Sequence, residues 1–294
     1  MVVRSVLTAT PVFVWRAFLF AGLAGCLVLQ AAPAGRKVRP PANYVQFGTP
    51  DQEAGAKIWR EFRGLGIAGD YYIEFQVRVM PRRGDEREVP GQLWGTRNEN
   101  GPLQRVWLGG AEADRMLIQN GPKPALWLAQ GDEGTARPVT DDRVPLVPDA
   151  DITLFDLQMP FLYWEDFVFE GVSRIRGRPA HTFLLYPPAD YGVEDSELAG
   201  VRVHLDTQFK ALVQTELINA DGKAYKTMSV LDLKKAGEQW MVKTIDWRDD
   251  RTRNKTRMQI TGVAFDQEFS PVIFEPGQLG LPLRAPEAII SLGR

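Results

Sequence analysis

Apolar and polar residues alternate in short runs over most of the chain, beginning at Tyr71. The runs are rich in valine, isoleucine, threonine and aromatic residues, which is typical of β-strands. They lie at 71–79, 105–110, 114–121, 125–131, 180–186, 201–207, 211–218, 225–233, 240–247 and 256–265. Turn-forming pairs separate several of them, at 120–121, 131–132, 221–222 and 237–238. The pattern predicts roughly ten strands in a large curved antiparallel sheet, open or partly closed.

One amphipathic helix is expected before the strands. Thr49 is a candidate N-cap, Pro50 stands at the first helical position, and Gln52 completes a capping box. Gly64 and Gly66 are expected to end the helix. Apolar residues recur at helical spacing between these limits, at Ile58, Trp59, Phe62 and Leu65.

The interval from 148 to 170 interrupts the strand pattern and is the most apolar stretch that follows the N-terminal region. Thr153, with Asp156 three residues later, resembles a capped helix start, and Pro160 would interrupt that helix. A short helical excursion this apolar must cover another surface. We therefore predict a lid from Asp151 to Phe169.

Several of the predicted strands are apolar on both faces. Neither face is clearly polar in residues 125–129 or 182–186, and the run 240–247 carries apolar side chains on both sides. If one face packs on the helices, the other must meet a second apolar layer or an apolar cavity. A filled sandwich core and a ligand cavity are both compatible with this pattern.

The N-terminus has the layout of a secretory signal peptide, predicted here to cover residues 1–34. Arginines precede an apolar run at 17–29, and small residues follow it. Ordinary cleavage near 31–34 is one interpretation. The other is a lipobox at 23–26, in which Cys26 becomes a lipidated N-terminus. Both predict export to the periplasm, with membrane anchoring if Cys26 is lipidated, and a proline-rich linker at 35–48 follows.

Composition and motifs argue against several classes of function. The net charge of −2 does not favour nucleic-acid binding, and two histidines and one cysteine leave little material for metal or nucleophilic chemistry. The glycines at 64–69 spell a dinucleotide fingerprint, but the helix comes before them rather than after. No serine lies in a GxSxG elbow. We therefore predict no enzyme activity, catalytic residue, metal site or cofactor.

The run DWRDDRTRNKTR at 246–257 is the most highly charged stretch of the chain. Strand-like runs flank it on both sides, so it is predicted to be the end of a hairpin. Its mixed charge makes it a poor phosphate track. A solvated hairpin is one interpretation, and a rim that docks an acidic partner or anionic headgroups is the other.

The order of these elements is similar to that of the LolA/LolB-like superfamily, and more specifically to the outer-membrane lipoprotein-sorting protein family. The segments that carry the resemblance are 151–161, 176–188, 203–230, 240–263 and 272–279. The resemblance implies an α+β, mainly β fold, in which a large curved antiparallel sheet forms an unclosed β-barrel with an N-terminal helix and a short helical lid. It also implies one domain over 49–283, followed by a C-terminal tail at 284–294.

In this superfamily the concave apolar face receives acyl chains, so the resemblance suggests an exported, non-enzymatic carrier or chaperone. The expected cargo is a lipidated protein or a lipid, a transport partner in the inner or outer membrane is compatible with it, and the chain is expected to be a monomer. The residues predicted to line the cavity are Trp107, Met116, Ile118, Trp127, Phe155, Phe161 and Trp164. The alternatives are a membrane-tethered structural or envelope-assembly lipoprotein without a ligand cavity, and a hydrolase whose site the sequence hides.

Overall fold

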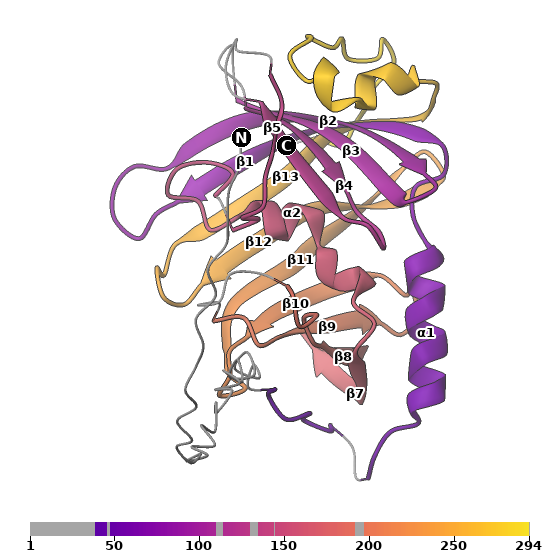
Figure 1. Cartoon of the computed structure of the whole chain (residues 1–294), viewed down its shortest axis with the longest axis vertical. Coiled ribbons are helices and arrows are strands. Elements are labelled where there is room, and N and C mark those ends of the chain that lie inside the picture. The colour runs from indigo at the N-terminus through magenta and orange to yellow at the C-terminus, as the bar shows by residue number, and fades with distance from the viewer. Residues whose placement is uncertain are drawn as a thin grey trace, which may run out of the picture. The chain divides into compact units, whose positions relative to one another are not determined.

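The strands form one continuous antiparallel sheet in the computed structural model, which describes residues 39–45, 48–109, 114–129, 135–143, 145–191 and 197–293 (Figure 1). Their order is β6-β5-β4-β3-β2-β1-β13-β12-β11-β10-β9-β8-β7, and β14 pairs with β13. In the described part of the chain β6 and β7 end this order, so the sheet is not closed. The predicted fold class, mainly β with an unclosed antiparallel sheet, is confirmed.

The strands differ widely in length, from two residues to thirteen. In the first half they are β1 (Asp70–Met80), β2 (Arg87–Asn98), β3 (Gly101–Leu108), β4 (Asp114–Gln119), β5 (Ala125–Ala129) and β6 (Arg137–Pro138). In the second half they are β7 (Phe167–Ile175), β8 (Arg178–Leu185), β9 (Gly200–Asp206), β10 (Leu212–Ile218), β11 (Ala224–Ala236), β12 (Gln239–Asp249), β13 (Lys255–Gln267) and β14 (Ile290–Ser291).

Strand β2 was not predicted, because its glycines and proline break the apolar alternation. In the sheet two of these glycines lie under aromatic rings of β1. A Cβ atom at Gly91 would stand 2.3 Å from the ring of Phe75, and one at Gly95 would stand 2.1 Å from the ring of Tyr71. The glycines are therefore required by close aromatic packing within a strand.

Helix α1 spans Gln52–Gly64, and its start corrects the predicted cap. Asp51, not Thr49, is the N-cap, and its side chain accepts hydrogen bonds from the backbone of Glu53 and Ala54. The Gln52 amide instead pairs with strand β7, donating to the carbonyl of Phe169 and accepting from its N–H, both at 2.9 Å. It thus extends the hydrogen bonding of β7 and fixes the start of the helix there.

The register assigns side chains to two faces of the sheet. One row of neighbours across five strands contains Ile73, Leu93, Val106, Met116 and Leu128. These side chains form the face that meets the lid, which we call the inner face. Side chains alternate between the two faces along each strand, so the neighbours of these residues along their strands point to the opposite, outer face.

The outer face is covered by the segment that follows β13. This segment contains two short helices, η3 (Pro271–Phe274) and η4 (Pro276–Gln278). Arg105, which is 1% exposed, donates to the carbonyls of Ile273 and Leu279 at 2.8 and 3.1 Å and also to that of Leu281. Burial and the nearby charge of Arg115 lower the pKa of Arg105 to about 10. A buried guanidinium held by carbonyls therefore fixes this cover.

Both ends of the folded part make contacts that the sequence did not indicate. In the predicted linker, Arg39 pairs with Asp166, and the carbonyl of Pro40 accepts from the Tyr186 hydroxyl at 3.0 Å. In the predicted tail, β14 pairs with β13, and Leu292 is buried. No helix in the described ranges is long and apolar enough to cross a membrane. The predicted signal peptide and Cys26 lie outside the described residues.

The Gln52 contact leads to a stability prediction. Replacing Gln52 by alanine removes two hydrogen bonds between α1 and the edge strand, so we expect the free energy of unfolding to fall by about 1–3 kcal/mol. Urea unfolding followed by circular dichroism measures this change. Glu53→Ala, an exposed change in the same helical turn, is the matched control. Equal stability of the two variants would contradict the anchoring role.

Candidate ligand-binding site

The predicted lid is present, although it ends earlier in the chain than expected. Helix α2 (Leu154–Gln158) begins with the predicted capping box between Thr153 and Asp156. Met159 adopts a left-handed backbone (φ 52°), and the short helix η2 (Pro160–Tyr163) follows. Phe167 and Phe169, which were assigned to the lid, belong instead to β7, because strand pairing takes over there. We call residues 145–164 the lid segment.

The lid segment packs on the inner face of the sheet in two apolar clusters. In the first, its side chains meet strands β1 to β5 and β11 to β13. In the second, they meet α1 and strands β7 to β10. The lid residues of the first cluster are Leu146, Ala150, Ile152 and Leu154, and those of the second are Phe155, Phe161 and Trp164. Lid side chains therefore occupy the inner face in this structure.

Five of the seven predicted cavity residues lie at this lid-covered surface. Met116 and Ile118 belong to the first cluster, and Phe155, Phe161 and Trp164 form an aromatic group in the second, with ring centroids 5.5 to 6.4 Å apart. The other two residues require a correction. Trp107 and Trp127 lie on the outer face under the C-terminal cover, because their register positions alternate with those of Val106 and Leu128.

Helix α2 of the lid is held by a buried ion pair that sequence reasoning missed. Lys226 of β11 donates to the carboxylate of Asp156, and both side chains are 6% exposed. The same carboxylate accepts from the backbone and the hydroxyl of Thr153, at 2.8 and 2.7 Å. A buried charge is costly without its partner, so this pair ties the lid position to β11.

The charged run at 246–257 also contacts the lid. It forms the predicted hairpin between β12 and β13, but its turn is more than a solvated end. Thr252 donates to a carboxylate oxygen of Asp151 at 2.9 Å, and Thr256 accepts from the Asp151 backbone at 2.9 Å. Asp249 beside them is buried and paired with Arg251.

A third contact holds the far end of α2 to the turn between β4 and β5. Asn120 donates to the carbonyl of Gln158 at 2.5 Å, and the Gln158 side chain donates to the carbonyl of Gln119 at 2.8 Å. Polar contacts thus hold both ends of α2, while its apolar side chains cover the sheet. We call the contacts of Lys226, Thr252 and Asn120 the lid latch.

A pocket of about 260 Å³ opens beside the latch. Its lining combines lid residues with charged residues of the hairpin turn: Arg143, Pro145, Ala150, Asp151, Thr153, Phe155, Glu197, Leu198, Leu217, Tyr225, Lys226, Asp249, Arg251 and Thr252. Apolar residues of both clusters reach this lining. The pocket therefore connects a polar rim to the apolar surface under the lid.

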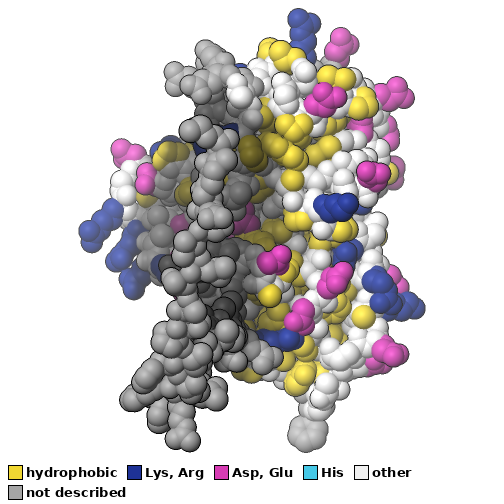
Figure 2. All heavy atoms as spheres, viewed as in Figure 1, with side chains coloured by type: hydrophobic (Ala, Val, Ile, Leu, Met, Phe, Trp, Pro, Cys, Tyr) yellow, Lys and Arg dark blue, Asp and Glu magenta, His cyan; other side chains and the backbone are white. Residues whose placement is uncertain are grey.

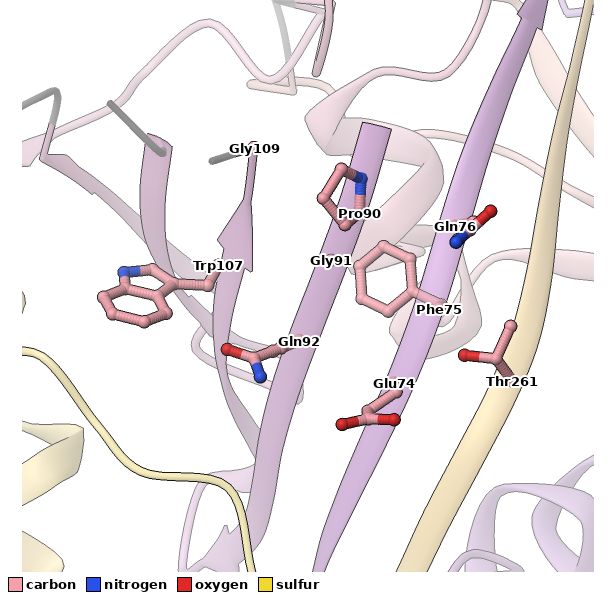
Figure 3. Close-up of a pocket in the computed structure, with 9 residues that line it drawn as sticks. All are labelled: Glu74, Phe75, Gln76, Pro90, Gly91, Gln92, Trp107, Gly109 and Thr261. Carbon is pink, nitrogen blue, oxygen red and sulfur yellow. The ribbon is translucent and has the colours of Figure 1, made fainter. Parts of the chain in front are cut away.

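A second pocket, of about 350 Å³, lies on the outer face and includes Trp107 (Figure 3). Glu74, Gln92 and Trp107 are cross-strand neighbours in one row. Gln92 donates to the Tyr72 hydroxyl at 2.7 Å, and that hydroxyl donates to Glu74 at 3.1 Å. Four of its nine lining residues, Glu74, Gln76, Gln92 and Thr261, are polar, so this pocket suits an acyl chain less well than the apolar surface under the lid.

The two histidines, His181 and His204, lie on neighbouring strands, β8 and β9. His204 belongs to a polar cluster that could be mistaken for a hydrolase triad. Its Nδ1 lies 3.0 Å from the hydroxyl of Thr182 and 3.4 Å from that of Ser173. Its Nε2 lies 3.7 Å from Glu216, which is beyond hydrogen-bond distance.

The carboxylate of this cluster, Glu216, also interacts with residues other than His204. Burial would raise the pKa of Glu216, but its interactions with His204 and Arg202 outweigh burial and lower it. Gln214 donates to the same side chain at 2.8 Å. The cluster therefore stabilises the outer face and does not present an activated nucleophile. Among the residues that the structure describes, no group of histidine, cysteine and carboxylate side chains could hold a metal ion.

Comparisons with known proteins agree with this geometry. A family model described as that of an uncharacterized protein matches residues 149–280, which include most of the lid segment and strands β7 to β13. No curated protein matches the sequence. A DUF1329 family protein from Desulfovibrio piger has a similar structure, with a TM-score of 0.67 and 13% identity, covering 79% of this chain and 100% of that chain.

Two further solved structures extend the comparison. A putative outer membrane lipoprotein-sorting protein domain from Vibrio parahaemolyticus has a TM-score of 0.68 and 14% identity, covering 79% of this chain and 100% of its own. A LolA superfamily protein from Nitrosomonas europaea has a TM-score of 0.58 and 13% identity, covering 75% and 96%. These identities establish similarity of fold. The chain therefore has the LolA-like fold that its sequence resembles.

Proposed function

We propose that this protein is an exported, non-enzymatic carrier that holds acyl chains of lipoproteins or other lipids between the lid segment and the inner face of the sheet. One observation carries the proposal. An aromatic lid covers an apolar face that spans most of the sheet, and polar contacts at Asp151, Asp156 and Gln158 hold α2 over that face. The similarity in fold to a domain described as lipoprotein-sorting supports it.

Loading such a carrier exchanges the contacts of the lid side chains with the sheet for contacts of the acyl chain with the sheet. An acyl chain in water costs about 0.8 kcal/mol for each exposed CH₂ group. The lid side chains now occupy the inner face, so cargo must displace Phe155, Phe161 or their neighbours as the lid moves. Replacing one set of apolar contacts by another is nearly balanced, and the latch then sets how readily the lid opens.

Asp151 makes the latch sensitive to pH. Burial raises the pKa of this carboxyl, the Thr252 hydrogen bond opposes the shift, and the charge of Asp249 adds to it. The folded state thus binds this proton more tightly than the unfolded chain does. Its contribution to stability is full at acidic pH and is lost as the pH rises through the raised pKa. Above its raised pKa the ionised Asp151 side chain weakens the latch.

The proposal places the mature chain in the periplasm, where it would meet lipidated proteins or lipids and a transport partner in the inner or outer membrane. The signal-like N-terminus supports export. If Cys26 is lipidated, the carrier would be tethered to a membrane.

A second candidate function is a membrane-tethered structural or envelope-assembly lipoprotein without a ligand cavity. The dense packing of Ile152, Leu154 and Phe161 against the sheet favours it, because these side chains are 0 to 3% exposed. Native mass spectrometry of the purified mature chain separates the two functions. The carrier should retain lipid or take up a fluorescent fatty acid, whereas repeated absence of both would support the structural role.

The ion pair of the latch leads to a kinetic prediction. Lys226→Met leaves the Asp156 charge buried without its partner, so the lid should open more often and fatty-acid uptake should be several-fold faster. Stopped-flow fluorescence measures the uptake rate, and hydrogen exchange reports opening of the lid.

Lys223→Met, in the turn that precedes β11, is the matched control. The double variant Lys226→Met with Asp156→Asn should return the uptake rate toward that of the parent, because it removes both charges. Unchanged uptake in Lys226→Met, despite faster exchange of the lid, would argue against entry beneath the lid.

The buried carboxyl leads to a pH prediction. Asp151→Asn removes an ionised group whose second oxygen has no hydrogen-bond partner in the described structure, so the free energy of unfolding should rise by about 1 kcal/mol at neutral pH. The gain should shrink on acidification, because the parent then becomes protonated. Urea unfolding near pH 7 and near pH 5 tests this, with exposed Asp250→Asn as control. A gain that does not change with pH would refute the assignment.

A further inference from the structure

Two aromatic side chains are exposed at neighbouring turns of the sheet. Trp240, just after the turn between β11 and β12, is 64% exposed, and Phe209, in the turn between β9 and β10, is 53% exposed. Trp59, Trp94 and Trp247 are each only 1% exposed. A large aromatic surface left in water at a turn is typical of an interaction site.

A hollow of about 930 Å³ lies between these turns. Most of its lining is apolar, and arginines stand at one end. The lining residues are Ile175, Arg176, Arg178, Pro179, Ala180, Asp206, Phe209, Ala211, Val213, Val230, Leu231, Asp232, Leu233, Trp240, Met241 and Val242. Figure 2 shows that apolar side chains also reach the surface between charged ones on the face drawn there.

The turns that border this hollow connect β7 to β8, β9 to β10 and β11 to β12. Alternate turns of an antiparallel sheet lie at the same end of the strands, and we call this end the turn edge, or simply this edge. This edge is basic although the whole chain has a net charge of −2. Residues 174–178, 206–211 and 232–243 contain seven basic and three acidic side chains: Arg174, Arg176, Arg178, Lys210, Lys234, Lys235 and Lys243, against Asp206, Asp232 and Glu238.

Local contacts orient part of this edge. Arg178 pairs with Asp206 at 3.1 Å, and its guanidinium lies 5.4 Å from the ring centroid of Phe209. Arg176 donates to the carbonyl of Val230 at 3.2 Å. Aromatic and cationic groups are therefore held together at the turns.

We propose that this edge docks onto the surface of an anionic phospholipid bilayer. Trp240 would enter the interfacial layer, where aromatic rings with a polar tip are favoured, and the apolar ring of Phe209 would reach the boundary with the acyl chains beside it. The surrounding arginines and lysines would contact lipid phosphates. The excess of positive charge favours an anionic membrane over an uncharged apolar partner. This docking does not depend on the proposed carrier function, because it requires neither the lid nor a bound acyl chain.

Vesicle binding tests the docking. The purified mature chain is mixed with vesicles of phosphatidylcholine alone or of phosphatidylcholine with phosphatidylglycerol, and the bound fraction is measured by sedimentation. We expect binding to the phosphatidylglycerol vesicles and weaker binding as the salt concentration rises. Brominated lipids in the same vesicles should quench the fluorescence of Trp240.

Replacing both Phe209 and Trp240 by serine should weaken vesicle binding by at least about tenfold. Leu281→Ser is the matched control, because Leu281 is 56% exposed but lies in the C-terminal cover. Circular dichroism checks that each variant is folded. Equal binding by the double variant and the parent would overturn the proposal. So would failure of the parent to bind phosphatidylglycerol vesicles, or light scattering that shows a dimer abolished by the double variant.

Discussion

A sheet that is apolar on its inner face, and on its outer face over β1 to β5 and β13, needs a cover on each side, and this constraint explains most of the structure. The inner face is covered by α1 and the lid segment, and the outer face by the segment with η3 and η4. Apolar burial drives both contacts but does not fix where each cover sits. Position comes from polar groups: the Lys226–Asp156 pair holds the lid, and Arg105 holds the outer cover.

The two covers differ in how firmly they are attached to the sheet. Arg105 binds carbonyls of a segment that continues into β14, so both ends of the outer cover are tied to the sheet. The lid segment is a connection between β6 and β7, the two ends of the strand order, and it depends on the latch for its position. Movement of the lid therefore leaves the strand pairing intact, which is what a carrier with a stable sheet requires.

The sequence predicted those elements that depend on residues close together in the chain. The capping box at Thr153, the hairpin at 246–257 and the main strands followed from turn and cap chemistry. Strand β2 was not predicted, because its glycines make room for the rings of Phe75 and Tyr71, which lie on another strand. The face of the sheet on which Trp107 and Trp127 lie depends on the strand register, because a shift of one residue moves a side chain to the opposite face. The latch joins residues 38 to 101 positions apart, such as Asp151 and Thr252, and no local pattern marks it.

Photo-crosslinking tests the central claim most directly, namely that acyl chains lie between the lid segment and the inner face. A fatty acid with a diazirine near its end would be bound to the mature chain, irradiated, and its attachment sites mapped by mass spectrometry. The account predicts attachment to lid residues such as Phe155 and to inner-face residues such as Met116 and Ile118. Attachment confined to the outer face or to the hollow beside Trp240, or no specific attachment, would contradict it.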